Sequence, residues 1–169
     1  MKVHLDTDLN QKTYIALKNL VDNSWYMQTQ AYEEGLHQNC SSFLNEFCTV
    51  KMCTARRSGH STAMVRLCCE YFNKAVIFLP TEKMIDNIGQ LFRPYVDNIT
   101  DQRRSRISIN NGESEYHICT NTNQIRGVEA EAIFVDCASF ISSAKMEDIE
   151  AVAKGCLRPP APFFLIYVE

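Results

Sequence analysis

The sequence has no long apolar segment: no run approaches the roughly 18 residues that a membrane-spanning helix needs. Its first residues also lack the apolar region of a secretory signal peptide. Both absences predict a cytoplasmic protein with no membrane partner, in the host cytoplasm if the chain is viral. A net charge of −3 at pH 7 argues against a protein that coats nucleic acid nonspecifically, although it leaves room for a local basic patch.

The sequence also lacks any C-x-x-C pair, although it contains eight cysteines. Most of them lie inside apolar runs, which predicts small buried side chains with free thiols rather than a disulfide framework. His4, His37 and His117 are far apart and show no ligand spacing, so they predict no zinc site. The cysteines are Cys40, Cys48, Cys53, Cys68, Cys69, Cys119, Cys137 and Cys156.

Length and composition are those of an ordinary globular domain. The chain has 169 residues, of which 46% are apolar and 22% are charged, so it is long enough to bury a substantial core. We expect a single domain with two parts. Residues 1–46 form a helical segment packed on the core, and residues 47–169 form the core itself.

The stretch from Thr54 to Thr62 lies between an apolar, β-leaning run and a segment with helical periodicity. When a strand leads through a turn of small residues into a helix, the backbone N–H groups at the start of the helix can point at a phosphate. In the P-loop pattern G-x-x-x-x-G-K-[ST], Thr54 stands at the first glycine and His60 replaces the lysine. Gly59 and Ser61 match the pattern. The alternative is a plain strand-to-helix turn. The predicted nucleotide-binding residues are Arg56, Arg57, Ser58, Gly59, His60, Ser61 and Thr62.

A second apolar segment, residues 131–136, ends in Asp136. A strand that ends in a carboxylate is the layout of a Walker B strand, whose Asp holds Mg²⁺. We therefore predict a metal site formed by Ser61 and Asp136. The next position usually carries a glutamate that orients the attacking water, and here it is Cys137. Cys137 is not predicted to be a nucleophile, because no histidine pattern accompanies it and the adjacent carboxylate disfavours a thiolate.

Together these stretches resemble the ATPase domain of the large subunit of viral DNA-packaging terminases, in herpesviruses and tailed phages. Those proteins carry an arginine-rich P-loop, R-R-x-G-K-[ST], and an N-x-I-R-G segment before a V-D-E-A-x-F-I run. The corresponding stretches here are residues 56–61, 123–127 and 135–141. The resemblance implies a P-loop NTPase fold with ATP and Mg²⁺ as cofactors. It also implies a coupling or DNA-contact role for Arg126 and Gly127.

Two departures from the family pattern bear on hydrolysis. His60 is shorter than lysine and carries no fixed positive charge, so Arg56 or Arg57 is expected to supply it. The thiol of Cys137 offers neither the basicity nor the acceptor geometry of a carboxylate, and losing such a base costs a factor of about 10²–10⁴ in rate. We expect phosphate binding that is weak or absent, and little ATP hydrolysis.

Hydrophobic periodicity outlines the elements. Residues 1–46 show broken 3–4 spacing, which predicts two short amphipathic helices with a break at Asn23-Ser24 and a stop at Gly35. From residue 47, apolar strands alternate with helices, which predicts a three-layer α/β domain, P-loop NTPase-like, with a mainly parallel central sheet. The expected strands are 47–53, 74–79, 131–136 and 163–168, and the expected helices are 61–73, 81–93 and 143–155.

Residues 97–116 form a polar interlude that we expect to be mostly loop. Within it, residues 107–109 and 116–119 flank a turn at 110–112 and are expected to pair as a hairpin or to form neighbouring strands. The arginine cluster at 103–106 is interpreted as a solvated loop rather than a nucleic-acid contact, because acidic residues flank it.

Two classes of function follow. The first is a degenerate terminase-like protein of viral origin that acts in DNA packaging or DNA metabolism, with DNA and other packaging proteins as partners. The second is a non-enzymatic regulator or inhibitor that keeps only the fold and binds another protein, for instance a host protein. A nucleotide kinase is disfavoured, because the sequence has no recognisable lid or acceptor-binding segment.

Overall fold

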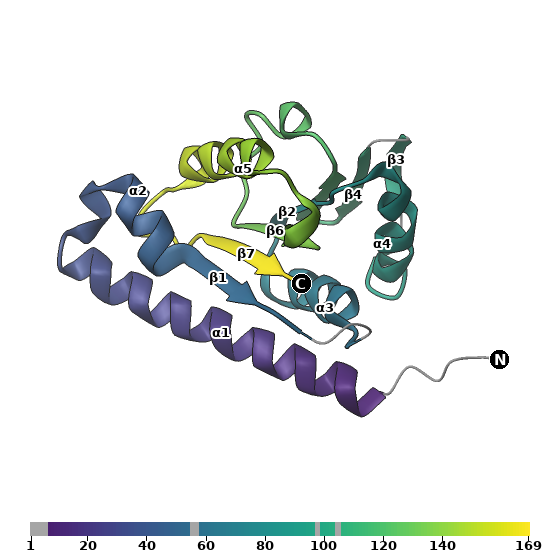
Figure 1. Ribbon diagram of the computed structural model, residues 1–169, viewed down its shortest axis with the longest axis horizontal. Coiled ribbons are helices and arrows are strands. Elements are labelled where there is room, and N and C mark those ends of the chain that lie inside the picture. The colour runs from purple at the N-terminus through teal and green to yellow at the C-terminus, as the bar shows by residue number, and fades with distance from the viewer. Residues whose placement is uncertain (1–6, 55–57, 97–98, 104–105) are drawn as a thin grey trace.

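The computed structural model describes residues 7–54, 58–96, 99–103 and 106–169 (Figure 1). The strands are β1 (Thr49–Met52), β2 (Lys74–Phe78), β3 (Ile99–Arg103), β4 (Arg106–Asn111), β5 (Ser114–Cys119), β6 (Ala132–Asp136) and β7 (Phe164–Val168). Within the described ranges these seven strands form one sheet in the order β1-β7-β6-β2-β5-β4-β3. The neighbouring strands β1, β7, β6, β2 and β5 are parallel to one another. β4 is antiparallel to both of its neighbours, β5 and β3.

Helices cover both faces of the sheet, with α5 above the strands and α3 below them in Figure 1. The helices are α1 (Thr7–Glu33), α2 (Cys40–Phe43), α3 (His60–Tyr71), α4 (Ile85–Phe92) and α5 (Ser143–Cys156). The strands supply both cores: Ala132 and Phe134 of β6 pack with α1, α3 and α4, and Ile133 and Val135 pack with α2 and α5. Fully apolar strands are required because both faces are covered. The predicted fold class, a three-layer α/β domain with a mainly parallel sheet, is confirmed.

The apolar strands are placed as the sequence predicts. β1, β2, β6 and β7 differ from the expected ranges by at most two residues at either end. Ser142 caps α5 by accepting a hydrogen bond from the backbone N–H of Lys145. All eight cysteines are free thiols, as predicted, although Cys40 and Cys53 are exposed. Among the described residues, no helix combines the length and the apolarity that a bilayer span requires.

The prediction of two short N-terminal helices is wrong, because α1 is one continuous helix of 27 residues. The expected break at Asn23-Ser24 fails because Ser24 points inward and its hydroxyl donates to the carbonyl of Phe47 at 2.6 Å. Val21 and Leu17 are fully buried one and two turns before it, so the helix keeps one inward face. Gly35, with φ 78°, follows the end of α1 as predicted.

The polar interlude contains more structure than the sequence predicts. The expected hairpin is present: β4 and β5 pair antiparallel, with Ile109 opposite Tyr116 and Gly112 at φ 64° in the turn. The assignment of residues 99–103 to a loop is wrong, because they form β3 along the free side of β4. A polar edge strand lacks the apolar alternation that identifies buried strands. Residues 104–105 of the arginine cluster lie outside the described residues.

A buried amide connects α1 to the start of β7. The side-chain amide nitrogen of Gln28 donates to the carbonyl of Phe163 at 2.8 Å, and its oxygen accepts from the N–H of Phe163 at 3.0 Å. Gln28 is 4% exposed, and its nitrogen also lies 3.2 Å from the hydroxyl oxygen of Ser24. One side chain therefore satisfies two backbone groups of a strand that is 135 residues away in the sequence.

Replacing Gln28 with leucine should lower the free energy of unfolding by about 2–4 kcal/mol, because it leaves two buried backbone groups without partners. Urea denaturation followed by circular dichroism measures this change. The matched control is Gln30→Leu on the exposed side of the same helix, which should stay within about 0.5 kcal/mol of wild type. Equal losses in the two variants would show that the Gln28 contacts contribute nothing specific.

Candidate functional site

The start of α3 has the geometry of an anion-binding helix terminus. Gly59 precedes the helix in the left-handed region (φ 77°, ψ 24°), and no side chain among the described residues caps the helix. The first helical bond in this turn is from the N–H of Ala63 to the carbonyl of Gly59, at 2.9 Å. The N–H groups of His60, Ser61 and Thr62 therefore have no partner within the helix. Such free donors, together with the helix dipole, favour a bound anion.

The two predicted metal ligands meet at this helix start. The hydroxyl of Ser61 donates to Oδ2 of Asp136 at 2.9 Å. Asp136 ends β6 and is 0% exposed. The contact follows from the topology, because parallel strands bring their carboxyl ends to the same edge of the sheet, where α3 also begins.

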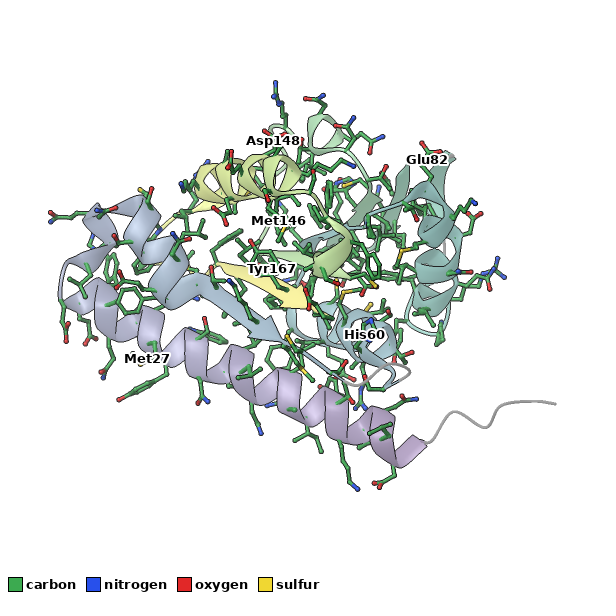
Figure 2. The ribbon with its side chains drawn as sticks, in the orientation of Figure 1. Met27, His60, Glu82, Met146, Asp148 and Tyr167 are labelled. Atoms are coloured by element: carbon green, nitrogen blue, oxygen red, sulfur yellow. The ribbon has the colours of Figure 1, made fainter. Side chains whose placement is uncertain are left out.

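The structure also brings His60 and Cys137 to this carboxylate. Nε2 of His60 lies 3.2 Å from Oδ1 of Asp136, and Sγ of Cys137 lies 4.0 Å from the same nitrogen. Figure 2 shows His60 at the start of α3. The expectation that no histidine accompanies Cys137 is therefore wrong. The two residues are 77 positions apart in the sequence, so the sequence alone does not indicate the pairing, which follows from the sheet edge that they share.

Cys137 is held in an unusual backbone conformation. With φ 53° and ψ 49°, it is the one non-glycine residue with positive φ in the described chain. A left-handed non-glycine residue costs on the order of 1–3 kcal/mol and is often found at functional sites. Burial raises the pKa of its thiol to about 11, and the charge and hydrogen bond of Asp136 and the charge of Glu169 act in the same direction. The thiol is therefore protonated at neutral pH and cannot act as a general base.

The arrangement is not that of a cysteine protease triad. In such a triad the imidazole contacts the thiol with one nitrogen and the carboxylate with the other. Here the thiol and the carboxylate both approach Nε2 of His60, whereas Nδ1 is buried with no hydrogen-bond partner among the described residues. The three side chains instead converge on a common point.

Helix α1 covers the turn before α3. The hydroxyl of Thr13 donates to the carbonyl of Ser58 at 3.0 Å, and Ser58 is 3% exposed. The amide oxygen of Asn10 lies so close to Gly59 that a Cβ there would approach it to 1.6 Å. Gly59 is therefore required both by its positive φ and by the side chain above it. Of the predicted nucleotide-binding residues, Arg56 and Arg57 lie outside the described residues.

Gly59→Ala should destabilise the protein by about 1–3 kcal/mol, because alanine is strained at φ 77° and its Cβ clashes with Asn10. Adding Asn10→Ala removes the clash and should restore part of this loss, whereas the strain remains. Gly155→Ala is the matched control. It lies inside α5 with open space around it, so it should stabilise by about 0.5–1 kcal/mol.

Thermal and urea unfolding of the single and double variants measure these changes. If Asn10→Ala gave no recovery in the Gly59→Ala background, Asn10 would not lie over this turn in solution.

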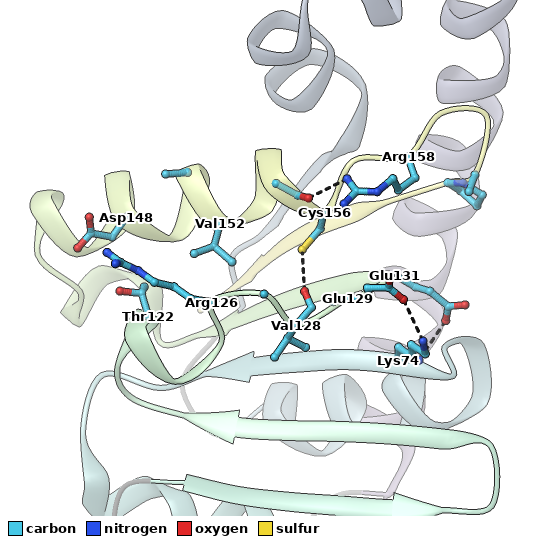
Figure 3. A pocket seen from close by; sticks show the side chains of 16 residues that line it. Lys74, Thr122, Arg126, Val128, Glu129, Glu131, Asp148, Val152, Cys156 and Arg158 are labelled. Atoms are coloured by element: carbon cyan, nitrogen blue, oxygen red, sulfur yellow. Dashed lines mark hydrogen bonds and ion pairs between the residues drawn. The ribbon is translucent and has the colours of Figure 1, made fainter.

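Arg126 and Gly127 lie apart from this site. They line a cavity of about 770 Å³ between helix α5 and the segment before β6 (Figure 3). Neither Asp136 nor any of residues 58–62 lines this cavity. Lys74, at the amino end of β2, also lines this cavity, which places it near the opposite ends of the strands from Asp136. In Figure 3 the guanidinium of Arg126 points toward Asp148 of α5. A coupling or DNA-contact role for Arg126 and Gly127 stays a prediction.

The sequence does not indicate a second buried polar cluster, which His117 forms with Ser108 and Glu115. Nδ1 of His117 lies 3.1 Å from the hydroxyl of Ser108 on the neighbouring strand, and its Nε2 lies 2.9 Å from Glu115. His117 is buried at 4% exposure, so these contacts satisfy both ring nitrogens inside the β4–β5 pair. The sequence cannot indicate the contact between Ser108 and His117, because it depends on the register in which β4 and β5 pair.

No protein-family model matches the chain, and no curated protein sequence matches it significantly. Among solved structures, it is similar to the large terminase of the thermophilic bacteriophage D6E, with a TM-score of 0.49 and 12% identity over 72% of this chain. Structures of that terminase with ADP and with ATP-gamma-S give the same TM-score, with 10% identity over 77% and 13% over 86% of this chain. The chain spans about a third of the length of these terminases (32%, 34% and 36%).

Proposed function

We propose that this chain is a degenerate terminase-like P-loop protein that binds nucleotide phosphate weakly at the start of α3 and hydrolyses ATP little. The observation that carries the proposal is the 2.9 Å contact between Ser61 and Asp136. It brings a free helix N-terminus and a strand-end carboxylate together, and phosphate with Mg²⁺ needs both. Ser61 and Asp136 supply the oxygen ligands that Mg²⁺ prefers, and the N–H groups of residues 60–62 would hold phosphate oxygens.

Weak binding is expected because the lysine charge is missing. His60 stands in the lysine position and lies 3.2 Å from Asp136, so its side chain is directed at the carboxylate. Ser58 is buried beneath α1 and cannot reach a ligand without a shift of that helix. The helix dipole alone contributes only about 0.3–1 kcal/mol toward an anion.

Slow hydrolysis follows from the residue after Asp136. A water-activating group must accept a proton near neutral pH. The thiol of Cys137, with its pKa raised to about 11 by burial and by Asp136, accepts none.

The biological role we propose is in viral DNA packaging or DNA metabolism, with DNA and packaging proteins as partners in the host cytoplasm. Support comes from the N-x-I-R-G segment at residues 123–127 and the arginine-rich stretch at residues 55–57, which resemble those of terminases. Arg126 is exposed, as a residue that contacts DNA must be.

Calorimetric titration of the protein with Mg-ATP, in a buffer with transition metals chelated, tests the binding. We expect saturable heat with a Kd on the order of 0.1 mM, or about −5.5 kcal/mol. Ser61→Ala removes a ligand of the proposed Mg²⁺ site and should abolish the heat. Ser41→Ala is the control, because Ser41 is exposed in α2, far from α3 in the sequence. Absence of heat at millimolar Mg-ATP in the wild type would contradict the proposal.

Phosphate release assays test the hydrolysis. The wild type should be close to background, and the double variant His60→Lys, Cys137→Glu should gain about 10²-fold or more, because it restores the fixed charge and the carboxylate base. The single variants should each gain less. Brisk turnover by the wild type would show that another residue activates water.

The second candidate function is that of a protein-binding regulator. One observation favours it: Trp25, Tyr26 and Met27 of α1 are 50%, 62% and 47% exposed, which is unusual for three large apolar side chains in a row. Trp25 is the single tryptophan of the chain, so its fluorescence reports directly on this surface. Lack of Mg-ATP binding, together with a change of Trp25 emission when a packaging protein or a host protein is added, would favour this function.

A further inference from the structure

Three metal-ligating side chains of different types converge beside α3. The ligand atoms of His60, Asp136 and Cys137 all lie within 4.8 Å of one another, and no other such group of three occurs in the described residues. We propose that these residues bind a single transition-metal ion, with Zn²⁺ as the ion that fits best. This site differs from the Ser61–Asp136 site expected for Mg²⁺, and its occupation requires no nucleotide.

The distances are close to those of a zinc site. Zinc lies about 2.0–2.1 Å from a histidine nitrogen, 2.0–2.2 Å from a carboxylate oxygen and 2.3 Å from a thiolate. In a tetrahedral site, the nitrogen is then about 3.3 Å from the oxygen and about 3.6 Å from the sulfur. The observed distances from Nε2 of His60 are 3.2 Å to Oδ1 of Asp136 and 4.0 Å to Sγ of Cys137. The nitrogen–sulfur distance is thus a few tenths of an ångström longer than in a zinc site, and all three ligand atoms lie within 4.8 Å of one another.

The carboxylate is the strongest sign that something is bound here. Asp136 is 0% exposed, and its Oδ1 accepts no hydrogen bond of proper angle from the described residues, although Nε2 of His60 is 3.2 Å away. The imidazole beside this buried oxygen is charged only when protonated, so a buried charge without balance remains when His60 is neutral. Ser61 holds the other oxygen, which turns Oδ1 toward His60 and Cys137. Ser61 thus takes the role of an outer-shell partner that orients a metal ligand.

The chemistry of the three ligands selects the ion. Thiolate and imidazole suit Zn²⁺, whereas Mg²⁺ prefers oxygen ligands only. Cys137 releases its thiol proton to solvent as the sulfur–zinc bond forms, and His60 binds as neutral imidazole. The negative charges of Asp136 and of the thiolate then balance the charge of the ion. Three protein ligands leave one tetrahedral position for a water molecule or an anion.

Titration of the chelator-treated full chain with Co²⁺, without nucleotide, tests this inference. Co²⁺ reports its surroundings by absorption, and a sulfur-to-metal charge-transfer band identifies a bound thiolate. We expect one ion per chain, the charge-transfer band, and displacement of Co²⁺ by Zn²⁺. Because an outer-shell partner is worth about 10–100-fold in affinity, loss of a direct ligand should weaken Zn²⁺ binding by about 100-fold or more.

Cys137→Ser should lose the band and most of the affinity, and His60→Gln should lose affinity while it keeps the band at high Co²⁺. The matched control is Cys53→Ser, an exposed thiol just after β1 at the same edge of the sheet, which should bind as the wild type does. Circular dichroism confirms that each variant is folded. An increase of Tm with Zn²⁺ in the wild type that is absent in Cys137→Ser gives a second readout.

The inference is overturned if the wild type and Cys137→Ser bind Co²⁺ equally, or if Cys53→Ser loses the band instead. These outcomes are separate from those of the Mg-ATP titration, which contains no transition metal. Zinc binding with no response to Mg-ATP would leave the metal site standing and contradict nucleotide binding.

Discussion

The burial of the Asp136 carboxylate is the constraint around which the candidate site is organised. A charge with no access to solvent must be paired or hydrogen-bonded, and the residues that do this come from the start of α3 and from the position after β6. The hydroxyl of Ser61 and the imidazole of His60 each approach one oxygen. The phosphate-binding and metal-binding hypotheses both depend on this group, and they differ in whether oxygen ligands or softer ligands complete the coordination of an ion.

Helix α1 is the second determinant of what the site can do. It contributes Thr13 and Asn10 to the turn before α3, so the turn is enclosed from the side on which α1 lies. The same helix presents Trp25 and Tyr26 to solvent, which means that one element both restricts the site and offers an apolar surface.

Much of the fold could be predicted from the sequence, because buried parallel strands are continuous apolar runs whose ends are marked by polar residues. The contact between Ser61 and Asp136 could also be predicted, since both follow strands of one sheet. The continuity of α1 could not, because Ser24 resembles a helix cap until its inward contact with Phe47 is known. Strand β3 has too few apolar residues to be distinguished from a loop.

The proximity of His60 to Cys137 is hidden in the sequence for a different reason. Against the family pattern, which has lysine and glutamate at these positions, each residue alone indicates a loss. Taken together, imidazole, thiol and carboxylate form a ligand set that neither substitution produces alone.

The position of β7 in the sheet has a consequence for how the chain assembles. β7 lies between β1 and β6, although Thr49 of β1 and its partner Leu165 of β7 are far apart in the sequence. Until it arrives, β1 has no hydrogen-bonded neighbour and the amide of Gln28 has no strand to bind. The first strand and the long helix beside it therefore keep apolar surface uncovered until this distant segment has been made and has paired. Such distant pairing predicts slow folding and a period in which a chaperone would be useful.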